Sequence, residues 1–158
     1  MSLSVQLRPV QPDDEEQLAQ IYASTRQQEL AVTGWPQAQI DVFLRQQFTA
    51  QQRHYRTYYP DARHDLLLLE QAVIGRLYVE RTSQRLHVID ISLLPDWRGR
   101  GIGGQLLAQL LAEADSRAQV TSIHVERHNP ALRLYQRLGF QLCEDKGIYL
   151  MLERQPRG

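Results

Sequence analysis

Residues 89–104 read IDISLLPDWRGRGIGG, an apolar run that passes through Pro95 into a segment dense in glycine. Proline has no N–H to donate to a strand ladder, so Pro95 ends the strand predicted over Leu86–Leu94. After the glycines, apolar residues recur three and four positions apart over Gly101–Ala118, as on one face of a helix. The stretch therefore predicts a strand that leads through a tight turn into an amphipathic helix.

The turn between this strand and this helix has the features of an anion site. The first N–H groups of a helix have no partner within it and lie at the positive end of its dipole. Glycines let a ligand approach that backbone, and Arg98 and Arg100 add positive charge. Glycines that only shape the connection are the alternative, but four of them in six residues beside two arginines favour a diphosphate. They are Gly99, Gly101, Gly103 and Gly104.

Short strands are predicted on both sides of this unit. Leu66–Leu69, Val73–Val79 and Leu86–Leu94 are separated by short polar breaks, which indicates an antiparallel meander. Val120–Val125 follows the helix, and a strand–helix–strand succession joins parallel neighbours. Two closing strands are expected over 140–144 and 148–152. The fold class predicted is therefore α/β with a mixed, mostly antiparallel sheet that contains one parallel pair.

Further helices are predicted from their cap residues. A short strand over Val5–Arg8 is followed by Asp13–Glu16, whose ends resemble a capping box. Pro36 opens a second helix, and both helices carry an apolar face suited to covering the sheet. Asn129–Pro130 provides an N-cap and first helical residue, and Gly139 is typical of the position after a helix end.

Composition excludes several function classes. The chain has 158 residues with 18 basic and 18 acidic side chains, which predicts one domain, residues 1–158, without a basic field for nucleic acid or anionic lipid. The first residues resemble no signal segment, and no apolar run approaches the ~20 residues of a membrane span. We expect a cytoplasmic protein with neither nucleic acid nor membrane as partner. The one cysteine, Cys143, lies in an apolar-flanked run and is predicted to be buried and without chemistry.

The glycine turn also matches a dinucleotide-binding pattern. Gly99-x-Gly101-x-x-Gly104 follows a strand, and Glu126 stands about 20 residues further on, as the pattern requires. However, only 54 residues follow Gly104, which is too few for the rest of a doubly wound sheet. The strands before the turn are also linked by hairpins rather than helices. A nucleotide-binding oxidoreductase is therefore the less favoured hypothesis.

Two motifs resemble those of the GCN5-related N-acetyltransferase (GNAT) family. Residues 89–103 are similar to its acetyl-CoA motif, Gln/Arg-x-x-Gly-x-Gly/Ala, in which Arg98, Gly101 and Gly103 fill the fixed positions. Residues 129–140, NPALRLYQRLGF, resemble its second motif, with an Asn, a Tyr and a Leu-Gly-Phe ending. The resemblance covers nearly the whole chain and is weakest over residues 27–65, where substrates usually differ.

The resemblance implies a GNAT-like fold, with helices on both faces and the parallel strands splayed apart at the acetyl-CoA site. The pantetheine arm would lie in that gap and contact the main chain of Leu93 and Leu94. Tyr135 would give a proton to the departing thiolate. The cofactor-binding residues implied are Leu93, Leu94, Arg98, Gly99, Arg100, Gly101, Ile102, Gly103, Gly104, Asn129 and Tyr135.

The general base is left open by the sequence. The family often carries a glutamate near position 87 or 89, and this chain has His87 and Ile89 there. His87, Asp90 and Glu80 are therefore the candidates, each with a structural role as its alternative. If side chains alternate along this strand, His87, Ile89 and Ile91 share one face, and Asp90 and Ser92 share the other. A strand bulge is the alternative that would change which way Asp90 faces. Asp90 interrupts an apolar run, so its carboxylate needs a partner or a wet cleft.

Other polar residues near the second motif are assigned lesser roles. His124, Glu126 and His128 recur at alternate positions, but no further ligand cluster supports a metal, and none is expected. Glu126 and Asn129 are instead expected as polar contacts where the acceptor and cofactor meet. Exposed apolar residues around Trp35 and Tyr58–Tyr59 could supply the interface of a homodimer.

These observations lead to one functional hypothesis and one alternative. The hypothesis is an N-acetyltransferase that moves the acetyl group of acetyl-CoA, used as a cosubstrate, to a primary amine of a small molecule or peptide. The amine would attack the thioester directly in a ternary complex. The alternative is a non-catalytic acyl-CoA-binding sensor, which the missing glutamate motivates and the retained Tyr135 disfavours.

Overall fold

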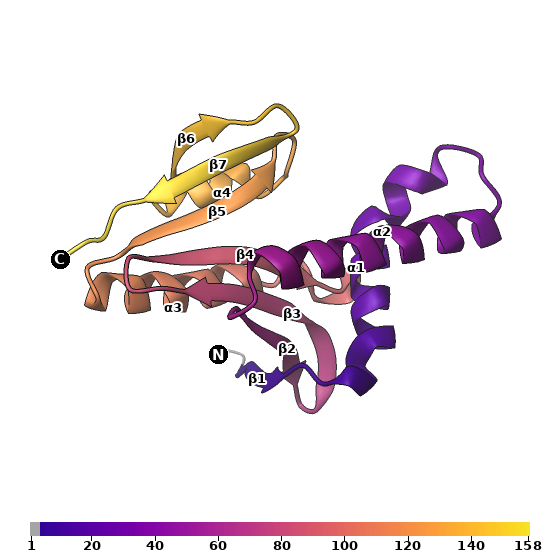
Figure 1. The fold of residues 1–158 in the computed structure, drawn as a ribbon, viewed down its shortest axis with the longest axis horizontal. Helices are drawn as coiled ribbons and strands as arrows, with labels where there is room; N and C mark the ends of the chain where they lie inside the picture. The colour runs from indigo at the N-terminus through magenta and orange to yellow at the C-terminus, as the bar shows by residue number, and fades with distance from the viewer. Residues whose placement is uncertain (1–3) are drawn as a thin grey trace.

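The computed structural model describes residues 4–158, which form one seven-stranded sheet in the order β1-β2-β3-β4-β5-β7-β6 (Figure 1). All neighbouring strands are antiparallel except β4 and β5, which are parallel. The predicted fold class is therefore confirmed. The strands are β1 (Gln6–Pro9), β2 (Arg63–Leu69), β3 (Ala72–Arg81), β4 (Arg85–Leu93), β5 (Val120–Glu126), β6 (Gln141–Asp145) and β7 (Tyr149–Arg154). The helices are α1 (Glu15–Ala31), α2 (Gln37–Tyr58), α3 (Ile102–Ser116) and α4 (Leu132–Arg137), with 3₁₀ helices at Pro12–Asp14 and Pro95–Trp97.

Helices cover both faces of the sheet, as the sequence predicted. The α1–α2 face is held by a core that includes Ile21, Leu44, Phe48 and Leu66 (Figure 1). The α3–α4 face has a larger core, to which α3, α4 and the inward residues of β2 to β5 and β7 contribute. Burial of these apolar side chains is the main source of stability for such a layered fold. Among residues 4–158, no helix has both the length and the apolar character that crossing a membrane requires.

The start of α1 differs from the predicted capping box. The Asp13–Glu16 pair makes no cap; instead, Asp14 caps the preceding 3₁₀ helix by accepting the Gln11 N–H at 2.8 Å. The same carboxylate binds the Arg8 guanidinium through both oxygens. This ion pair lowers the pKa of Asp14 and ties β1 to the helix start, which a local pattern does not reveal.

The structure also corrects two local predictions near the second motif, namely where its helix begins and whether Cys143 is buried. The helix over the second motif begins at Leu132, two residues after Pro130, because Asn129 Oδ1 accepts the Ala131 N–H at 2.8 Å and forms a turn first. Gly139 has φ +101°, as expected after a helix end. The prediction for Cys143 was wrong: it lies exposed on β6, an edge strand whose five residues are all exposed. Glu153 raises the pKa of its thiol.

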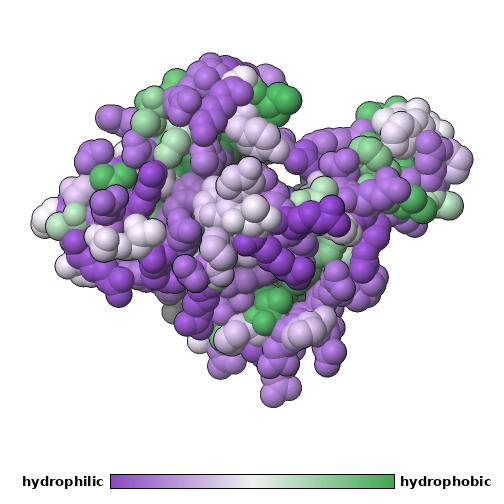
Figure 2. Space-filling model, viewed as in Figure 1, coloured by the Kyte–Doolittle hydropathy of each residue, from purple (hydrophilic) through white to green (hydrophobic). Residues whose placement is uncertain are grey.

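Helices α1 and α2 form an arm that extends beyond the edge of the sheet (Figure 1). Its tip carries exposed apolar side chains, which Figure 2 shows as green atoms at the right. Trp35 is 38% exposed and packs edge-on against Phe43, with ring centroids 5.6 Å apart. Tyr58, at the other end of α2, is 66% exposed. Trp35 and Tyr58 are therefore on the surface near opposite ends of α2, whereas Tyr59 is half-buried and stacks on His87.

A bulge in β4 changes which residues share a face. Tyr78 pairs with Asp90 and Val79 with Val88, so Ile89 is an extra residue without a partner in β3. Leu86 and Val88 before the bulge, and Ile91 after it, all contribute to the α3–α4 core. Asp90 and Ser92 share a face, as predicted, but the prediction that His87 lies on the opposite face was wrong, because the bulge reverses the pleat and places His87 and Asp90 on the same α1–α2 face.

The backbone of β4 packs so closely against Gly75 of β3 that a side chain has no room there. A Cβ built on Gly75 would lie 2.1 Å from Ser92 O and 3.0 Å from Leu93 Cα, both on the backbone of β4. We predict that Gly75→Ala lowers the free energy of unfolding by about 3 kcal/mol, measured by urea denaturation, because the strands must move apart. Gly103→Ala is the matched control, since its Cβ would approach Leu93 Cδ1 only to 4.0 Å within a helix. Equal stability of the two variants would contradict this packing.

Candidate active site

Strands β4 and β5 separate part-way along their length. Their pairing runs from Arg85 opposite Val120 to Val88 opposite Ile123 and then stops. Beyond that point β4 continues to Leu93 beside β3, and β5 continues to Glu126 beside β7. The gap opens where the bulge at Ile89 bends β4 away. The structure thus contains the splayed parallel pair that the sequence led us to expect.

The glycine turn lies at the end of β4 that borders this gap. Gly99 and Gly101 adopt left-handed backbone conformations, with φ +72° and +81°, and Gly101 is the N-cap of α3. Gln105 is the first residue of α3 whose N–H reaches back within the helix, to Gly101 O at 3.0 Å. A Cβ at Gly99, Gly101 or Gly104 would meet no atom within 4 Å. The backbone N–H groups at the start of α3 are thus accessible to an anion.

Arginines hold this turn in place. Arg98 Nε donates to Leu93 O at 2.9 Å, and Arg98 Nη2 lies 3.3 Å from Ser24 O and Oγ on α1. The Arg100 guanidinium lies 4.9 Å from the centre of the Trp97 ring. Both main-chain groups of Leu94 are engaged within the chain, to Ile74 O and to the Trp97 N–H. The main-chain N–H and C=O of Leu94 and the C=O of Leu93, which were predicted to contact the cofactor, are therefore already hydrogen-bonded within the chain.

Tyr135 lies on the α3–α4 side of the gap. It is 5% exposed and packs edge-on against Phe140, with ring centroids 5.9 Å apart. Burial, with a smaller contribution from the negative charge of Asp90, raises the pKa of Tyr135 to about 12. The phenol therefore keeps its proton at neutral pH.

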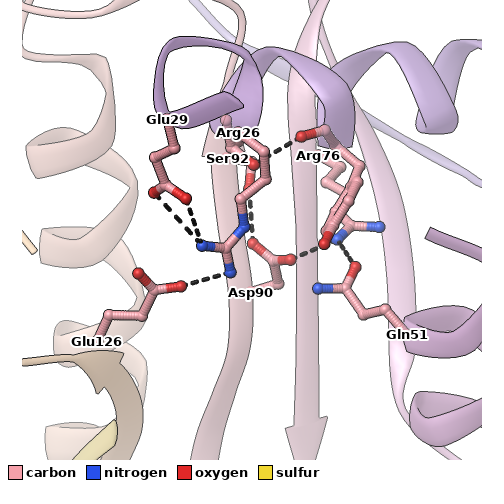
Figure 3. A network of polar contacts seen from close by, with 9 residues as sticks. Arg26, Glu29, Gln51, Arg76, Asp90, Ser92 and Glu126 are labelled. Carbon is pink, nitrogen blue, oxygen red and sulfur yellow. Dashed lines mark hydrogen bonds and ion pairs between the residues drawn. The ribbon is translucent and has the colours of Figure 1, made fainter. Parts of the chain in front are cut away.

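Asp90 lies on the stretch of β4 that borders the gap, and its carboxylate is fixed by two donors (Figure 3). Ser92 Oγ donates to Oδ1 at 2.6 Å, and Arg76 Nη2 donates to Oδ2 at 2.5 Å. Arg76 is 1% exposed, and its Nη2 also reaches Gln51 Oε1 on α2 at 2.6 Å. A buried guanidinium requires a counterion, and Asp90 supplies it to Arg76.

A second ion-pair group closes the outer end of the gap (Figure 3). Arg26 of α1 binds Glu126 Oε1, at the end of β5, at 2.5 Å, and it also contacts Glu29 at 3.4 Å. This contact joins α1 to β5 across the mouth of the gap. Glu126 therefore has Arg26 as its partner at the end of β5.

His87 and Glu80 lie further from the gap. His87 is in the paired part of β4, opposite Ser122, whose Oγ is 2.7 Å from its Nδ1. It is buried between the Tyr59 ring, 5.6 Å away, and the His124 ring, 5.1 Å away. Burial first, then the charge of its neighbours, lowers the pKa of His87 to about 4. Glu80, on β3, lies in register with His87 of β4. Neither residue borders the opening that begins after Val88.

Buried His87 and half-buried His64 should make the protein sensitive to acid. Burial also lowers the pKa of His64 to about 4. Because the unfolded chain binds these protons near pH 6.5, the stability is complete above that pH and is lost as the pH falls towards 4. Between pH 6.5 and pH 5, the proton that each histidine binds in the unfolded chain should lower the free energy of unfolding by about 2 kcal/mol. We predict that urea denaturation at pH 7 and pH 5 shows this loss, and that His87→Gln removes about half of it; an unchanged difference would refute the assignment.

The histidine pattern along β5 does not form a metal site. His124 and Glu126 belong to β5, and His128 follows the strand end in an exposed turn. Within residues 4–158 no group of three or more His, Cys, Asp or Glu side chains could hold a metal ion.

Several site residues were not found from the sequence. Arg76 binds Asp90, Gln51 binds Arg76, and Arg26 joins α1 to the end of β5. A signal for Arg76 was present, since it interrupts the apolar run Val73–Val79 just as Asp90 interrupts its own strand. Gln51 and Arg26 lie on helices, in polar stretches of sequence typical of exposed positions. Only the fold brings them to this region.

Comparison with known proteins agrees with this geometry. The family model described as "Acetyltransferase (GNAT) domain" matches residues 62–142, which is just over half of the chain and spans β2 to α4. The chain belongs to the GNAT acetyltransferase family. The match includes the glycine turn, the gap and Tyr135, so the GNAT family replaces the dinucleotide-binding alternative.

One relative and two solved structures are similar to this GNAT chain. A curated mycothiol acetyltransferase of Corynebacterium aurimucosum is 36% identical over 74 residues, 46% of this chain, and the chain spans about a quarter (24%) of that relative's length. An acetyltransferase from Thermus thermophilus is 25% identical, with TM-score 0.68 and 97% of each chain covered. The PaiA N-acetyltransferase of Thermoplasma acidophilum, solved in complex with coenzyme A, is 16% identical with TM-score 0.71, covering 97% of this chain and 99% of that one.

Proposed function

We propose that this protein is an N-acetyltransferase that transfers the acetyl group of acetyl-CoA to a primary amine by direct attack in a ternary complex. The observation that carries the proposal is the gap between β4 and β5, bordered by an open glycine turn, by Tyr135 and by Asp90. Family membership supports the acyl transfer. A structural neighbour from Elizabethkingia anophelis, a GNAT family acetyltransferase solved with acetyl-CoA bound, supports the cofactor.

The glycine turn fits the diphosphate of coenzyme A. The space above Gly99, Gly101 and Gly104 is free of protein atoms that a Cβ would meet, so phosphate oxygens can reach the N–H groups that begin α3. Arg100 adds a positive charge at the same place. Bound acetyl-CoA would supply the thioester, whose C–S bond breaks as the new amide bond forms.

Tyr135 is suited to protonate the leaving thiolate. Its raised pKa keeps the phenol protonated, and it is the phenol of the second motif that lies beside the gap. Asn129, which caps the turn before α4, positions that helix through the Ala131 N–H. We assign Asn129 a positioning role rather than a direct contact.

Asp90 is the better placed of the three candidate bases. It borders the gap, whereas His87 lies in the paired part of the strand and Glu80 on the next strand. Its two oxygens already accept from Ser92 and Arg76, but each carboxylate oxygen has a second lone pair. We propose that Asp90 orients the amine or a water molecule that takes the amine proton. Its ion pair with Arg76 is also the observation that favours the sensor alternative, since the carboxylate already serves as the counterion of a buried guanidinium.

A thiol-release assay with acetyl-CoA and a panel of primary amines tests the proposal. Each panel member is run beside its N-acetylated form, which has the same shape but no free amine. CoA release that depends on the free amine supports transfer. Binding of CoA by calorimetry without turnover for any amine would support the sensor, and failure to bind CoA would overturn the assignment of the glycine turn to the cofactor.

A further inference from the structure

One turn of α1 contacts both strands that border the gap. Arg98 Nη2, after the end of β4, lies 3.3 Å from Ser24 O and Oγ. Further along the same turn, Arg26 Nη2 lies 2.5 Å from Oε1 of Glu126, the last residue of β5. Helix α1 also packs against β4 itself. This turn of α1 therefore spans the open end of the gap, and the side chains around it lie beside the entrance.

Glu126 points to the same side of the sheet as Asp90. Ile123 and Val125 of β5 belong to the α3–α4 core, and the register of β5 with β7 is unbroken over residues 121–126. Because side chains alternate along a regular strand, Glu126 lies on the opposite face, where α1 and α2 pack. The glycine turn instead leads into α3, on the α3–α4 face. With CoA on that side, the acceptor amine reaches the thioester from the α1–α2 face.

The charges at this entrance do not cancel. Arg26 is one positive charge between two carboxylates, Glu126 at 2.5 Å and Glu29 at 3.4 Å (Figure 3). Both carboxylates are accessible to a ligand, since the side chains of Glu126 and Glu29 are 36% and 60% exposed. Asp90 is the counterion of Arg76. One negative charge is therefore in excess on the acceptor side of the gap.

The positive charges nearby have partners of their own. Arg127, which follows β5, binds Asp145, and Lys146 Nζ lies 4.0 Å from Glu144 Oε2. Arg98 lies at the glycine turn, where the diphosphate of coenzyme A would neutralise it. None of these three cations offsets the carboxylate in excess beside Arg26.

An exposed aromatic ring lies beside the same carboxylate. Tyr149 of β7 is in register with Glu126, so the two side chains share a face of the sheet. Tyr149 is 45% exposed. The face of an aromatic ring attracts an ammonium ion, as a carboxylate does. The entrance therefore offers two kinds of group that favour a cation over a neutral or negative ligand.

We propose that the acceptor carries a second positive charge, which Glu126 and Glu29 hold while its free amine reaches the thioester. The inference rests on the proposed acetyl transfer and adds the class of acceptor, a short diamine rather than an amino alcohol or an amino acid. The second ammonium group donates charge-assisted hydrogen bonds to the two carboxylates and lies against the Tyr149 ring. Because the carboxylates are partly exposed, salt screens this attraction.

Three acceptors of equal chain length test the class on the unaltered protein. They are 1,5-diaminopentane, 5-amino-1-pentanol and 5-aminopentanoate, whose far ends are positive, neutral and negative at pH 7. We expect kcat/KM for CoA release to be about tenfold higher for the diamine than for the amino alcohol, mainly through KM, and lowest for the amino acid. Sodium chloride should reduce the difference. Equal values for the three acceptors would overturn the inference and leave acetyl transfer intact, whereas release with none of them would count against the transfer itself.

A pair of variants gives an independent measurement. Glu126→Gln leaves Arg26 and Glu29 as a neutral pair, so the ratio of kcat/KM between the diamine and the amino alcohol should fall to about twofold, as expected for two equivalent amines. Glu153→Gln is the matched control, because Glu153 lies on the same face of β7 but opposite Ser122, in the paired part of β5, and should leave the ratio unchanged. A ratio that stays high in Glu126→Gln, or falls equally in both variants, would refute the role of Glu126.

Discussion

Replacing Tyr135 with phenylalanine should lower kcat for amine acetylation by about 100-fold or more, while the Kd for CoA stays within about twofold. The ring is buried against Phe140, so phenylalanine keeps the packing and removes only the hydroxyl. The departing thiolate then loses its proton donor, which affects the transition state and not the bound cofactor. Steady-state kinetics with the best amine of the panel, together with calorimetry for CoA, measure both quantities.

Tyr55→Phe is the matched control for this prediction. Tyr55 lies on α2, on the opposite face, and burial followed by the charge of Asp90 raises its pKa as well. Both phenols therefore stay protonated near Asp90, but the resemblance to the family assigns the proton transfer to Tyr135 alone. A kcat that falls equally in both variants, or in Tyr55→Phe only, would move the acid to the α1–α2 side of the gap.

Replacing Asp90 with alanine should lower the free energy of unfolding by about 3–5 kcal/mol, because it leaves the Arg76 guanidinium buried without a counterion. Arg76 is 1% exposed, and Nε and Nη1 have no hydrogen-bond partner among the described residues. Gln51 would remain as a neutral acceptor, which does not offset the charge. Urea denaturation at pH 7 measures the loss.

The double variant Arg76→Leu with Asp90→Leu separates the charge effect from lost packing. If the unpaired guanidinium is the cause, removing both charges should restore most of the stability that Asp90→Ala loses. Arg26→Met serves as a reference for a more exposed pair, since it breaks the Arg26–Glu126 contact at the rim, and should cost less than about 1 kcal/mol. A double variant as unstable as Asp90→Ala would show that shape at this position matters more than charge.

Together, Tyr135→Phe and Asp90→Ala distinguish a loss of catalysis from a loss of stability at one site. Tyr135→Phe should impair turnover in a fully stable protein, whereas Asp90→Ala should impair both turnover and stability. Activity of Asp90→Ala must therefore be measured well below its unfolding temperature. Activity that survives in the folded Asp90→Ala protein would remove Asp90 from the candidate bases and leave a role in holding Arg76.

Local patterns in the sequence were enough to predict most of the fold. Strand β4 ends at Leu93, just before Pro95, the glycine turn leads into α3, and hydrophobic spacing located each strand within a few residues. These features depend on neighbours in the chain, through backbone geometry and the spacing of apolar side chains. The same is true of the glycine turn, where Gly99 and Gly101 take the left-handed conformations that glycine favours.

The arrangement of charges was decided by the tertiary structure. The bulge at Ile89 depends on how β4 pairs with β3, and it alone brings Asp90 to the face where Arg76 lies. Cys143 is exposed because β6 is the last strand of the sheet, which its own sequence does not show. Strand register and burial are set by partners distant in the chain, so the sequence determined the elements and the glycine turn. Only the fold determined the ion pairs and the gap.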